Sequence, residues 1–518
     1  MSVLLALFLP GCGLGEWARN GGKVGPNYSV APTAVAANWI DYQDPRVKSE
    51  EQDLSHWWGV FGDPVLDSLV DEAVRQNLSL RVAGERIAES RARRGIAAGN
   101  LFPQQQEVAG SHTWNKASTE AVTGTNEQWF RNSEVGFNVS WELDLWGRFR
   151  RAIEAADADL DASVANFDDV LVVLLADVSS NYIQYRTFQE RVGIARRNVE
   201  SQSRSYQLAQ DKFKAGATTE RDVQQSKQVL EQTRALIPQL EAGQRQAANA
   251  LCVLLGIPPL DLTARLGTAG NIPTAPPELA LGIPADLLRR RPDVRRFERQ
   301  AAVQSALIGV AKADLYPRLS LIGSIGVRAE DFSDMFKTPG SVSGFVGPSF
   351  SWDVLNYGRI ESNVHVQEAR FRQAVYGYQE SVLRAGREAE DAVVGFLKSQ
   401  ERARYLGDSV AAAARTVEIS YVQYQQGVID FTPVYLFEGT LAQEQDQLAI
   451  ARGQIALSLV DLYRALGGGW EMRLPPATAG PPPPSPATTR PAETGPAAAA
   501  AAAPTAAART NPPAFLTR

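Results

Sequence analysis

The chain contains one unit twice, and this internal repeat limits its possible folds more than any other feature of the sequence. Residues 77–103 align without gaps to residues 291–317, and the motif Trp141–Arg148 aligns to Trp352–Arg359 at an offset of 211. The same offset recurs further along the chain, and chance seldom preserves one offset over such a distance. A chain of 518 residues could hold about three or four ordinary domains of ~150 residues. We predict instead one architecture built from two tandem copies.

A seven-residue period dominates each copy. Every seventh residue from Val164 to Phe213 is apolar, and so is every seventh residue from Val375 to Tyr424. A strict period of seven keeps one side of a helix against a neighbour and produces a left-handed supercoil. We therefore predict one helix over 148–214, which at ~1.5 Å per residue is about 100 Å long. A rod of that length does not fit inside an ordinary globular core.

Each long helix is expected to end at a glycine and turn back. Gly216 and Gly427 stand at equivalent positions of the two copies, where a left-handed residue can stop a helix. After the first glycine, Thr219 and Asp222 have the spacing of a capping box. After the second, Thr432–Pro433 predicts an N-cap with proline in the first turn. Each copy is thus expected to be a long antiparallel hairpin with a tight tip.

Ahead of each long helix, the period changes to that of a strand. Apolar residues alternate with polar or small ones between Val135 and Leu145, and a similar alternation runs through 319–327. Two strands of less clear register are predicted near Gln105–Ser118 and Gly344–Val354. Alternation over ~10 residues with aromatic residues near the ends is typical of lipid-facing outer-membrane strands. A soluble, half-buried sheet would produce the same pattern.

If these strands lie in a membrane, they need partners from outside the chain. No apolar stretch approaches the ~18–20 residues of a spanning helix, and the longest, Val170–Val178, is interrupted by Asp177. Any crossing of a bilayer must then use β-strands. Four strands cannot close a barrel, since about eight is the lower limit in single-chain examples. Because open edges are not tolerated in lipid, the pattern predicts an oligomer.

The two ends of the chain differ from the repeated body. The start, MSVLLALFLPGCG, resembles a bacterial lipoprotein signal, which predicts lipidation of Cys12. An ordinary N-terminus is the alternative, because Pro10 is atypical and no Lys or Arg precedes the apolar run. The other end, 475–518, is rich in proline and alanine, so we expect a disordered tail. Spanning the peptidoglycan or docking a partner is its alternative role.

Composition argues against nucleic-acid binding and against catalysis. The 52 Lys+Arg and 58 Asp+Glu give a net charge of −6, which leaves no basic excess for a polyanion. The three histidines and two cysteines lie far apart, so neither a metal cluster nor a disulfide framework is expected. We find no nucleophile with a base and an orienting group, and no phosphate-binding loop. We therefore expect no enzyme, no metal and no cofactor.

Four motifs resemble those of the TolC-like outer-membrane efflux proteins. They are Val24–Tyr28, Trp57–Pro64, Trp141–Arg148 and Gly282–Asp293, in the order typical of the family. The resemblance covers roughly residues 12–471 and is closest to the lipoprotein branch that works with RND-type pumps. It implies a mainly α-helical fold with a membrane β-barrel portion. Three copies would share a twelve-strand barrel in the outer membrane and form a long α-helical coiled-coil tunnel across the periplasm.

The same resemblance implies a function and a set of partners. The homotrimer would be the exit duct of a tripartite efflux pump, through which drugs, metals or other small molecules pass passively to the exterior. An RND-type pump would sit in the inner membrane of the Gram-negative cell, joined to the duct by a periplasmic adaptor (membrane fusion) protein. Outer-membrane lipid would hold the barrel and the acylated N-terminus. The alternative, a soluble periplasmic coiled-coil adaptor or scaffold, explains the heptads but not the strands.

The resemblance divides the chain into two efflux repeats with shorter segments around them. A proline-rich link between the repeats belongs to an equatorial collar. The expected segments are a signal peptide (1–11), a lipid-anchored extended segment (12–53), the first repeat (54–271), the link (272–284), the second repeat (285–474) and the tail (475–518).

Gating residues of the family lie at the periplasmic tip, where the hairpins close like an iris. Counted from the glycines, Asp222 matches an acidic tip residue, and Tyr424 matches a tyrosine that hydrogen-bonds to it across the hairpins in the closed state. Capping of a helix is the alternative role for Asp222 and the favoured one for Asp430, which is also a gate candidate. A ring of three carboxylates in a narrow bore would attract cations.

Two departures from the family pattern affect this gate. Ile429 stands where some members have an arginine, and Leu436 stands where an acidic residue is common. The family latch is therefore expected only in part, with Asp430 or Glu438 supplying the negative charge instead.

The opposite end of each long helix is expected to be the junction between barrel and helix. Both copies carry a tryptophan followed by a glycine where the alternating pattern stops: Trp141 and Gly147 in the first, Trp352 and Gly358 in the second. These residues should mark the points at which strands pass into helices.

Overall fold

The computed structural model describes residues 15, 17–48, 50, 53–116, 129–267, 270–280, 289–337 and 339–474. Contacts divide the chain into one unit up to Arg473 and a second from Leu474, and the description below concerns the first. The predicted signal peptide, Cys12 and the tail 475–518 lie outside the described residues, as do residues 281–284 of the predicted link.

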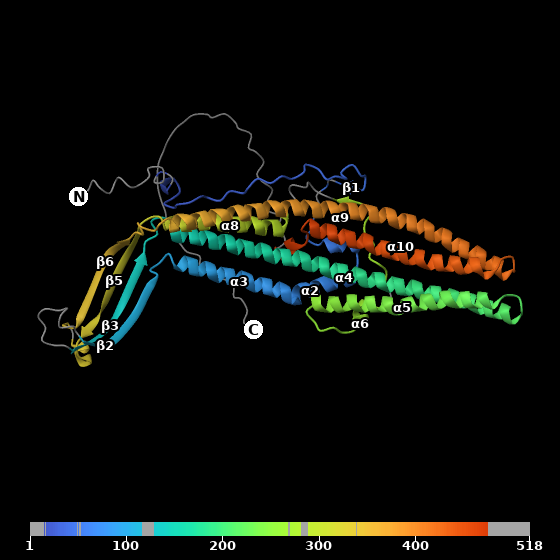
Figure 1. Cartoon of the computed structure of the whole chain (residues 1–518), viewed down its shortest axis with the longest axis horizontal. Helices are drawn as coiled ribbons and strands as arrows, with labels where there is room; N and C mark the ends of the chain where they lie inside the picture. Colours follow the sequence, from blue (N-terminus) through green and yellow to red (C-terminus); the bar gives the residue numbers. More distant parts are fainter. Residues whose placement is uncertain are drawn as a thin grey trace, which may run out of the picture. The chain divides into compact units, whose positions relative to one another are not determined.

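Two helical hairpins make up most of the fold (Figure 1). Each consists of a helix of 67 residues followed by a helix of 35 residues, and equivalent helices begin 211 residues apart. The helix predicted over 148–214 is confirmed. Among the described helices, none has a run of apolar residues long enough to cross a membrane. The four helices are α4 (Arg148–Lys214), α5 (Glu220–Leu254), α9 (Arg359–Gln425) and α10 (Phe431–Ala465).

Eight heptad residues are buried, seven of them in the middle of the long helices, where the two hairpins meet, and one, Tyr424, at the tip. α10 packs against both α9 and α4, so the second hairpin lies on the first. Burying a side chain of this size contributes roughly 1.5–3 kcal/mol. The heptad residues at most 7% exposed are Leu171, Val178, Tyr185 and Val192 of α4 and Val382, Ala389, Phe396 and Tyr424 of α9.

Shorter helices lead into each long one. α3 packs along α4, and α8 packs against both α4 and α9. The carboxylate of Asp63 caps α2 by accepting from Val65 N at 2.9 Å, and Asn77 Oδ1 caps α3 by accepting from Leu80 N at 2.9 Å. These elements are α2 (Pro64–Gln76), α3 (Leu78–Gly99) and α8 (Pro292–Ala313), with short turns η1 (Trp57–Phe61), α6 (Thr263–Leu266), η2 (Phe332–Phe336) and η3 (Trp470–Arg473).

The largest hydrophobic core surrounds the middle of α4. Trp57 and Trp58 of η1 are buried there, and Trp57 stacks on Tyr463 of α10 with ring centroids 5.1 Å apart. Trp39 of the N-terminal segment enters the same core. This segment is tied to the link between the repeats through β1 (Val47–Lys48) and β4 (Leu279–Ala280), which pair in parallel.

Four antiparallel strands form one sheet at the end of the hairpins opposite their turns (Figure 1). The strand order is β2-β3-β5-β6, so the strands of the second copy continue the sheet of the first. All four predicted strands are present, with β3 beginning six residues before the predicted start. Each outer strand, β2 and β6, has one edge without a partner strand among the described residues. The bounds are β2 (Gln105–Lys116), β3 (Trp129–Glu142), β5 (Arg318–Ala329) and β6 (Val342–Ser351).

The register gives the sheet one apolar face and one polar face. Phe137 of β3 pairs with Val108 on one side and Ile325 on the other, whereas the next residue, Asn138, pairs with Glu107. Ile325 is 61% exposed, and Val108 is 75% exposed. A row of exposed apolar side chains opposite a polar row is the pattern of a strand between lipid and a wet interior.

Candidate functional site

Both predicted tip glycines end their helices in the left-handed conformation. The φ angle is +70° at Gly216 and +77° at Gly427, a region that costs a residue with a Cβ about 1–2 kcal/mol. Ala217 N donates to the Lys212 carbonyl at 2.8 Å, and the equivalent bond of the second tip is 2.9 Å long. These bonds satisfy carbonyls that would otherwise be left free at the helix ends.

Asp222 is 2% exposed and bonds within its own hairpin. The Thr218 hydroxyl donates to one carboxylate oxygen, and the Thr219 hydroxyl lies 3.4 Å from the other. Arg221 Nη2 lies 3.5 Å from the same oxygen as Thr219. Thr219 is the N-cap residue of α5, as predicted, but its hydroxyl bonds the carboxylate and no backbone N–H. Asp222 therefore holds the turn between α4 and α5 together.

Tyr424 is also 2% exposed, and it lies beside Asp222 without bonding to it. Burial raises the pKa of its hydroxyl, the nearby Thr218 hydroxyl lowers it, and the charge of Asp222 raises it. The Thr218 hydroxyl donates to Asp222, and the tyrosine oxygen has no hydrogen-bond partner among the described residues. Its ring packs edge-on against Phe431, with centroids 5.2 Å apart. The expected tyrosine–aspartate hydrogen bond is thus not made within this chain.

Lys212 of the first hairpin holds Tyr424 of the second from two directions. Its ammonium group donates to the Tyr424 carbonyl and lies 4.4 Å from the centroid of the tyrosine ring. A hydrogen bond from a charged donor and a cation–π contact reinforce each other here. Lys212 is therefore a direct link between the two tips.

Asp430 is the N-cap of α10, as its favoured role implied. Its carboxylate accepts from Thr432 N at 3.2 Å, and the helix begins at Phe431. The prediction that Thr432 is the cap was wrong, because the aspartate two residues earlier takes that position and places Thr432 in the first turn. The second oxygen of Asp430 lies 3.2 Å from Arg221 Nη2, which makes an exposed ion pair between the hairpins.

Glu438 is buried, so within one chain it does not offer an exposed charge to replace the acidic residue that many family members have at the position of Leu436. It is 6% exposed and lies between α10 and α4, where the Ser205 hydroxyl is 2.5 Å from its Oε1. Burial raises the pKa of this carboxyl group, against the lowering effect of the serine hydrogen bond. Within one chain Glu438 is thus covered by its own helices, and a contribution of its charge to the gate stays a prediction.

Further along the same seam, polar pairs connect α4 with α10. Asn198 Nδ2 donates to Gln445 Oε1 at 3.0 Å. Arg191 makes a bidentate ion pair with Asp446, at 2.7 and 3.0 Å. These pairs were not predicted from the sequence, and neither were the contacts of Lys212, Arg221 and Ser205. The one signal in the sequence that could have indicated these contacts is a polar residue at a helix position that faces a neighbouring helix.

The junction tryptophans anchor the sheet to the leading helices in the same way in both copies. Trp141 Nε1 donates to the Leu101 carbonyl at 3.1 Å, and Trp352 Nε1 donates to the Leu315 carbonyl at 3.0 Å. Gly147 and Gly358 are the N-cap residues of α4 and α9. Both have φ +78°, so each strand turns into its helix through a left-handed glycine.

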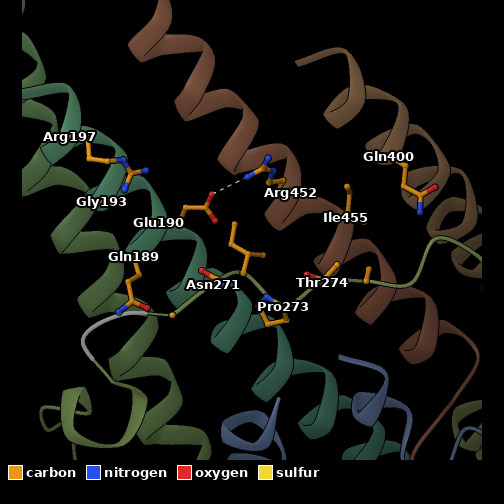
Figure 2. A pocket seen from close by; sticks show the side chains of 13 residues that line it. Gln189, Glu190, Gly193, Arg197, Asn271, Pro273, Thr274, Gln400, Arg452 and Ile455 are labelled. Carbon is orange, nitrogen blue, oxygen red and sulfur yellow. Dashed lines mark hydrogen bonds and ion pairs between the residues drawn. The ribbon is translucent and has the colours of Figure 1, made fainter. Parts of the chain in front are cut away.

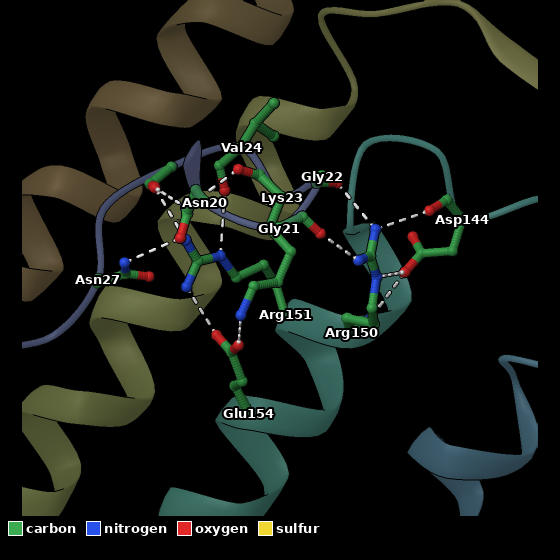
Figure 3. A network of polar contacts seen from close by, with 11 residues as sticks. Asn20, Gly21, Gly22, Lys23, Val24, Asn27, Asp144, Arg150, Arg151 and Glu154 are labelled. Atoms are coloured by element: carbon green, nitrogen blue, oxygen red, sulfur yellow. Dashed lines mark hydrogen bonds and ion pairs between the residues drawn. The ribbon is translucent and has the colours of Figure 1, made fainter. Parts of the chain in front are cut away.

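An N-terminal strap, residues 17–48, begins against the first junction (Figure 3). Arg150 donates to Asp144 at 2.9 Å and to the Gly21 carbonyl at 2.7 Å. Arg151, whose side chain is 2% exposed, donates to the Val24 carbonyl at 3.1 Å. The charge of each arginine thus fixes the backbone of the strap on the first turn of α4.

A polar crevice of about 780 Å³ lies where the link crosses the hairpins (Figure 2). Asn271, directly before the link, and Pro273 of the link form one wall, and Arg197 of α4 and Arg452 of α10 reach in from the helices. Arg452 lies 3.5 Å from Glu190. The crevice lies far from the tip residues and has no part in their contacts.

Comparison with protein families gives the same two-part division. The model of the outer membrane efflux protein family matches residues 69–257 and again residues 283–468. The two matches contain the two hairpins and the strands that precede them.

Individual relatives match over nearly their whole length. Nodulation protein T of Rhizobium leguminosarum bv. trifolii is 30% identical over 467 residues, which are 89% of this chain and 97% of that protein. Outer membrane protein OprJ of Pseudomonas aeruginosa is 30% identical over 478 residues, covering 91% and 95% of the two chains. The cation efflux system protein CusC of Escherichia coli is 26% identical over 476 residues, covering 90% and 98%.

Solved structures share the fold. The outer-membrane channel OprN superposes with a TM-score of 0.82 at 34% identity, covering 86% of this chain and 99% of that one. The open state of the Neisseria gonorrhoeae MtrE outer membrane channel gives a TM-score of 0.74 at 25% identity, covering 87% and 99%.

Proposed function

The chain belongs to the outer membrane efflux protein family, and from this we propose that it is the exit duct of a tripartite efflux pump. It is an outer-membrane channel of a Gram-negative bacterium that extends into the periplasm. The observation that carries the proposal is the combination of one sheet, apolar on one face and polar on the other, with two hairpins of equal length. Cargo would pass through without chemical change, so the chain is proposed to have no catalytic activity and no cofactor.

A homotrimer is the assembly we propose, because one chain leaves complementary edges open. β2 and β6 each have an edge without a partner among the described strands. On α9, the side chains of Tyr376, Leu383 and Tyr405 are all more than 60% exposed. In a closed ring, one neighbouring copy would cover the edge of β2 and another the edge of β6, and the apolar row would be covered as well. Three copies of four strands would make the twelve-strand barrel that the family resemblance implies.

The proposed partners lie on the periplasmic side. Named relatives belong to a cation efflux system and to pyoverdine export, so related ducts serve different cargo. We propose that a periplasmic adaptor docks at the hairpin tips and that an RND-type pump in the inner membrane selects the substrate. The proposed acyl chains on Cys12 would anchor the strap in outer-membrane lipid.

Fractionation and conductance test this function. The full chain should sediment with outer-membrane vesicles, migrate as a trimer in detergent and form discrete conducting events in planar bilayers. A monomer that stays in the soluble periplasmic fraction would support a coiled-coil scaffold and contradict the channel. Trimers that never conduct, even when the tip is loosened by Lys212→Met, would contradict the exit duct.

A further inference from the structure

Towards the tips, several buried side chains of the two hairpins are polar, and two of them, Ser205 and Glu438, meet across the seam between α4 and α10. All of these side chains are at most 6% exposed, and they come from all four long helices. An apolar seam would give the hairpins a larger hydrophobic stabilisation, so this layer is a weak point in their association. The residues are Gln202 and Ser205 of α4, Ser226 of α5, Ser420 of α9 and Glu438 of α10.

Glu438 is the acidic member of this polar layer, and its bonds are incomplete. The Ser205 hydroxyl lies 2.5 Å from its Oε1. One turn away on α4, the buried Oε1 of Gln202 has no hydrogen-bond partner among the described residues. A carboxylate that is buried with a single neutral hydrogen-bond donor has lost its hydration and has no cation beside it, so burial disfavours its charged form.

Charged groups of the packed helices are engaged elsewhere. Arg204 of α4 pairs with Glu200, and Arg415 of α9 pairs with Glu418. Groups nearer the tips are engaged as well. Lys212 of α4 binds the carbonyl and ring of Tyr424. Asp222 of α5 bonds to Thr218, and Arg221 bonds to Asp430. Tyr424 of α9 packs against Phe431. Burial and the Ser205 hydroxyl are the influences found on Glu438, and no charged group is among them.

We propose that Glu438 is a protonation-dependent lock between the two hairpins of one chain, neutral while the α4–α10 seam is closed and ionised when the seam opens. This role goes beyond the proposed channel function and rests on it only for its biological use. Opening would bring water to the carboxylate and break the bond to Ser205. The lock is distinct from a charged ring in the bore, because the side chain is covered by its own chain.

The sign of the pH dependence follows from burial. In the closed seam the pKa of Glu438 is raised above its ordinary 4.5, and in an open, hydrated seam it returns towards that value. The lock is therefore fully engaged below about pH 4.5 and is lost as the pH rises through the raised pKa. Each tenfold difference in proton affinity between the two states makes opening about tenfold easier at high pH.

Distances between spin labels measure this lock without requiring conduction. Labels on Gln228→Cys of α5 and Gln443→Cys of α10 would be placed in full-length chain carrying Cys252→Ala, solubilised in detergent. From about pH 5 to about pH 8, the population with a long interlabel distance should rise on the order of tenfold. Glu438→Gln, which stays neutral, should remain short at both pH values.

Two controls make the test specific. Glu418→Gln removes an exposed carboxylate of α9 and should keep the full pH response. Ser205→Ala removes the bond that lowers the pKa of Glu438. The pKa in the closed seam should therefore rise, and the transition should move to higher pH. A distance distribution independent of pH, or one whose pH response survives Glu438→Gln, would overturn the lock. Trimers that show the distance change but never conduct would contradict the channel and leave the lock standing.

Discussion

At the residue scale, the tip is held by side chains that cross from one hairpin to the other. Asp222 bonds within its own turn, whereas Lys212 reaches the second hairpin and binds Tyr424. Arg221 reaches Asp430, but this pair is more than half exposed on both sides and should contribute little. The lysine is therefore the stronger link.

Replacing Lys212 with methionine should loosen the tip. The variant keeps the apolar stem but loses a charged hydrogen bond and a cation–π contact, together worth about 1–3 kcal/mol. Single-channel conductance in planar bilayers should rise or show more frequent openings. Lys214→Met, at a side chain 73% exposed, is the matched control and should behave as the parent. Equal conductance for both variants would remove Lys212 from the gate.

Tyr424→Phe should leave the tip closed. The hydroxyl is buried without a hydrogen-bond partner, so its loss should leave the free energy of unfolding unchanged or raise it by about 1 kcal/mol. Tyr424→Ala, which also removes the ring contact with Phe431, should raise conductance. A higher conductance of Tyr424→Phe would contradict this expectation. It would indicate that the hydroxyl makes a hydrogen bond to another copy of the chain.

At the element scale, glycines allow α4 to be approached closely by helices of both hairpins. A Cβ at Gly243 of α5 would lie 2.6 Å from the ring of Phe188, and a Cβ at Gly453 of α10 would lie 2.3 Å from the Thr187 hydroxyl oxygen. These neighbouring residues of α4 mark one level at which both helices are in tight contact with it.

Gly453→Ala should destabilise the folded chain by about 1–3 kcal/mol, since the added methyl group forces the helices apart. Thermal unfolding followed by circular dichroism would record a lower midpoint. Gly407→Ala of α9 meets no atom within 4 Å and should be neutral or stabilising. A variant at 453 as stable as the parent would show that α10 can shift along α4 without cost.

The sequence predicted the elements well and their mutual contacts poorly. The period of seven and the left-handed glycines are local signals, and they located α4 and both tips. The prediction of an N-cap at Thr432 was wrong, because Asp430 takes that position and Thr432 lies in the first turn. The burial of Glu438 could not be predicted, because it depends on the register of α10 against α4, which no local pattern records.

At the scale of the whole molecule, the last described turn fastens the chain back to the middle of α4. Arg473 donates to both oxygens of Asp168, at 2.7 and 3.0 Å, and Asp168 is fully buried. Burial raises the pKa of Asp168, and Arg473 and then Arg295 oppose that rise. The pair thus compensates a charge that α4 would otherwise bury at a cost.

Arg473→Ala should make stability depend on pH. Without the guanidinium, the pKa of Asp168 rises further, so stability is retained below the ordinary carboxyl pKa and falls as the pH rises through the new value. Loss of one partner of a fully buried pair costs about 3–5 kcal/mol near neutral pH. The loss here should be smaller, because Arg473 is 35% exposed and Arg295 stays 3.9 Å from Asp168. Denaturant unfolding across pH would show this, and adding Asp168→Asn should remove the pH dependence. A pH-independent loss in the single variant would contradict the account.

The equal lengths of the two hairpins have a consequence for whatever meets them. In the proposed trimer, three chains would present six turns at nearly one depth, a rim with pseudo-sixfold rather than threefold character. A docking protein could then bind in three or in six copies with little geometric difference. Selection between these stoichiometries would depend on the few positions at which the turns differ, such as the exposed Arg221 of one and Thr432 at the equivalent position of the other.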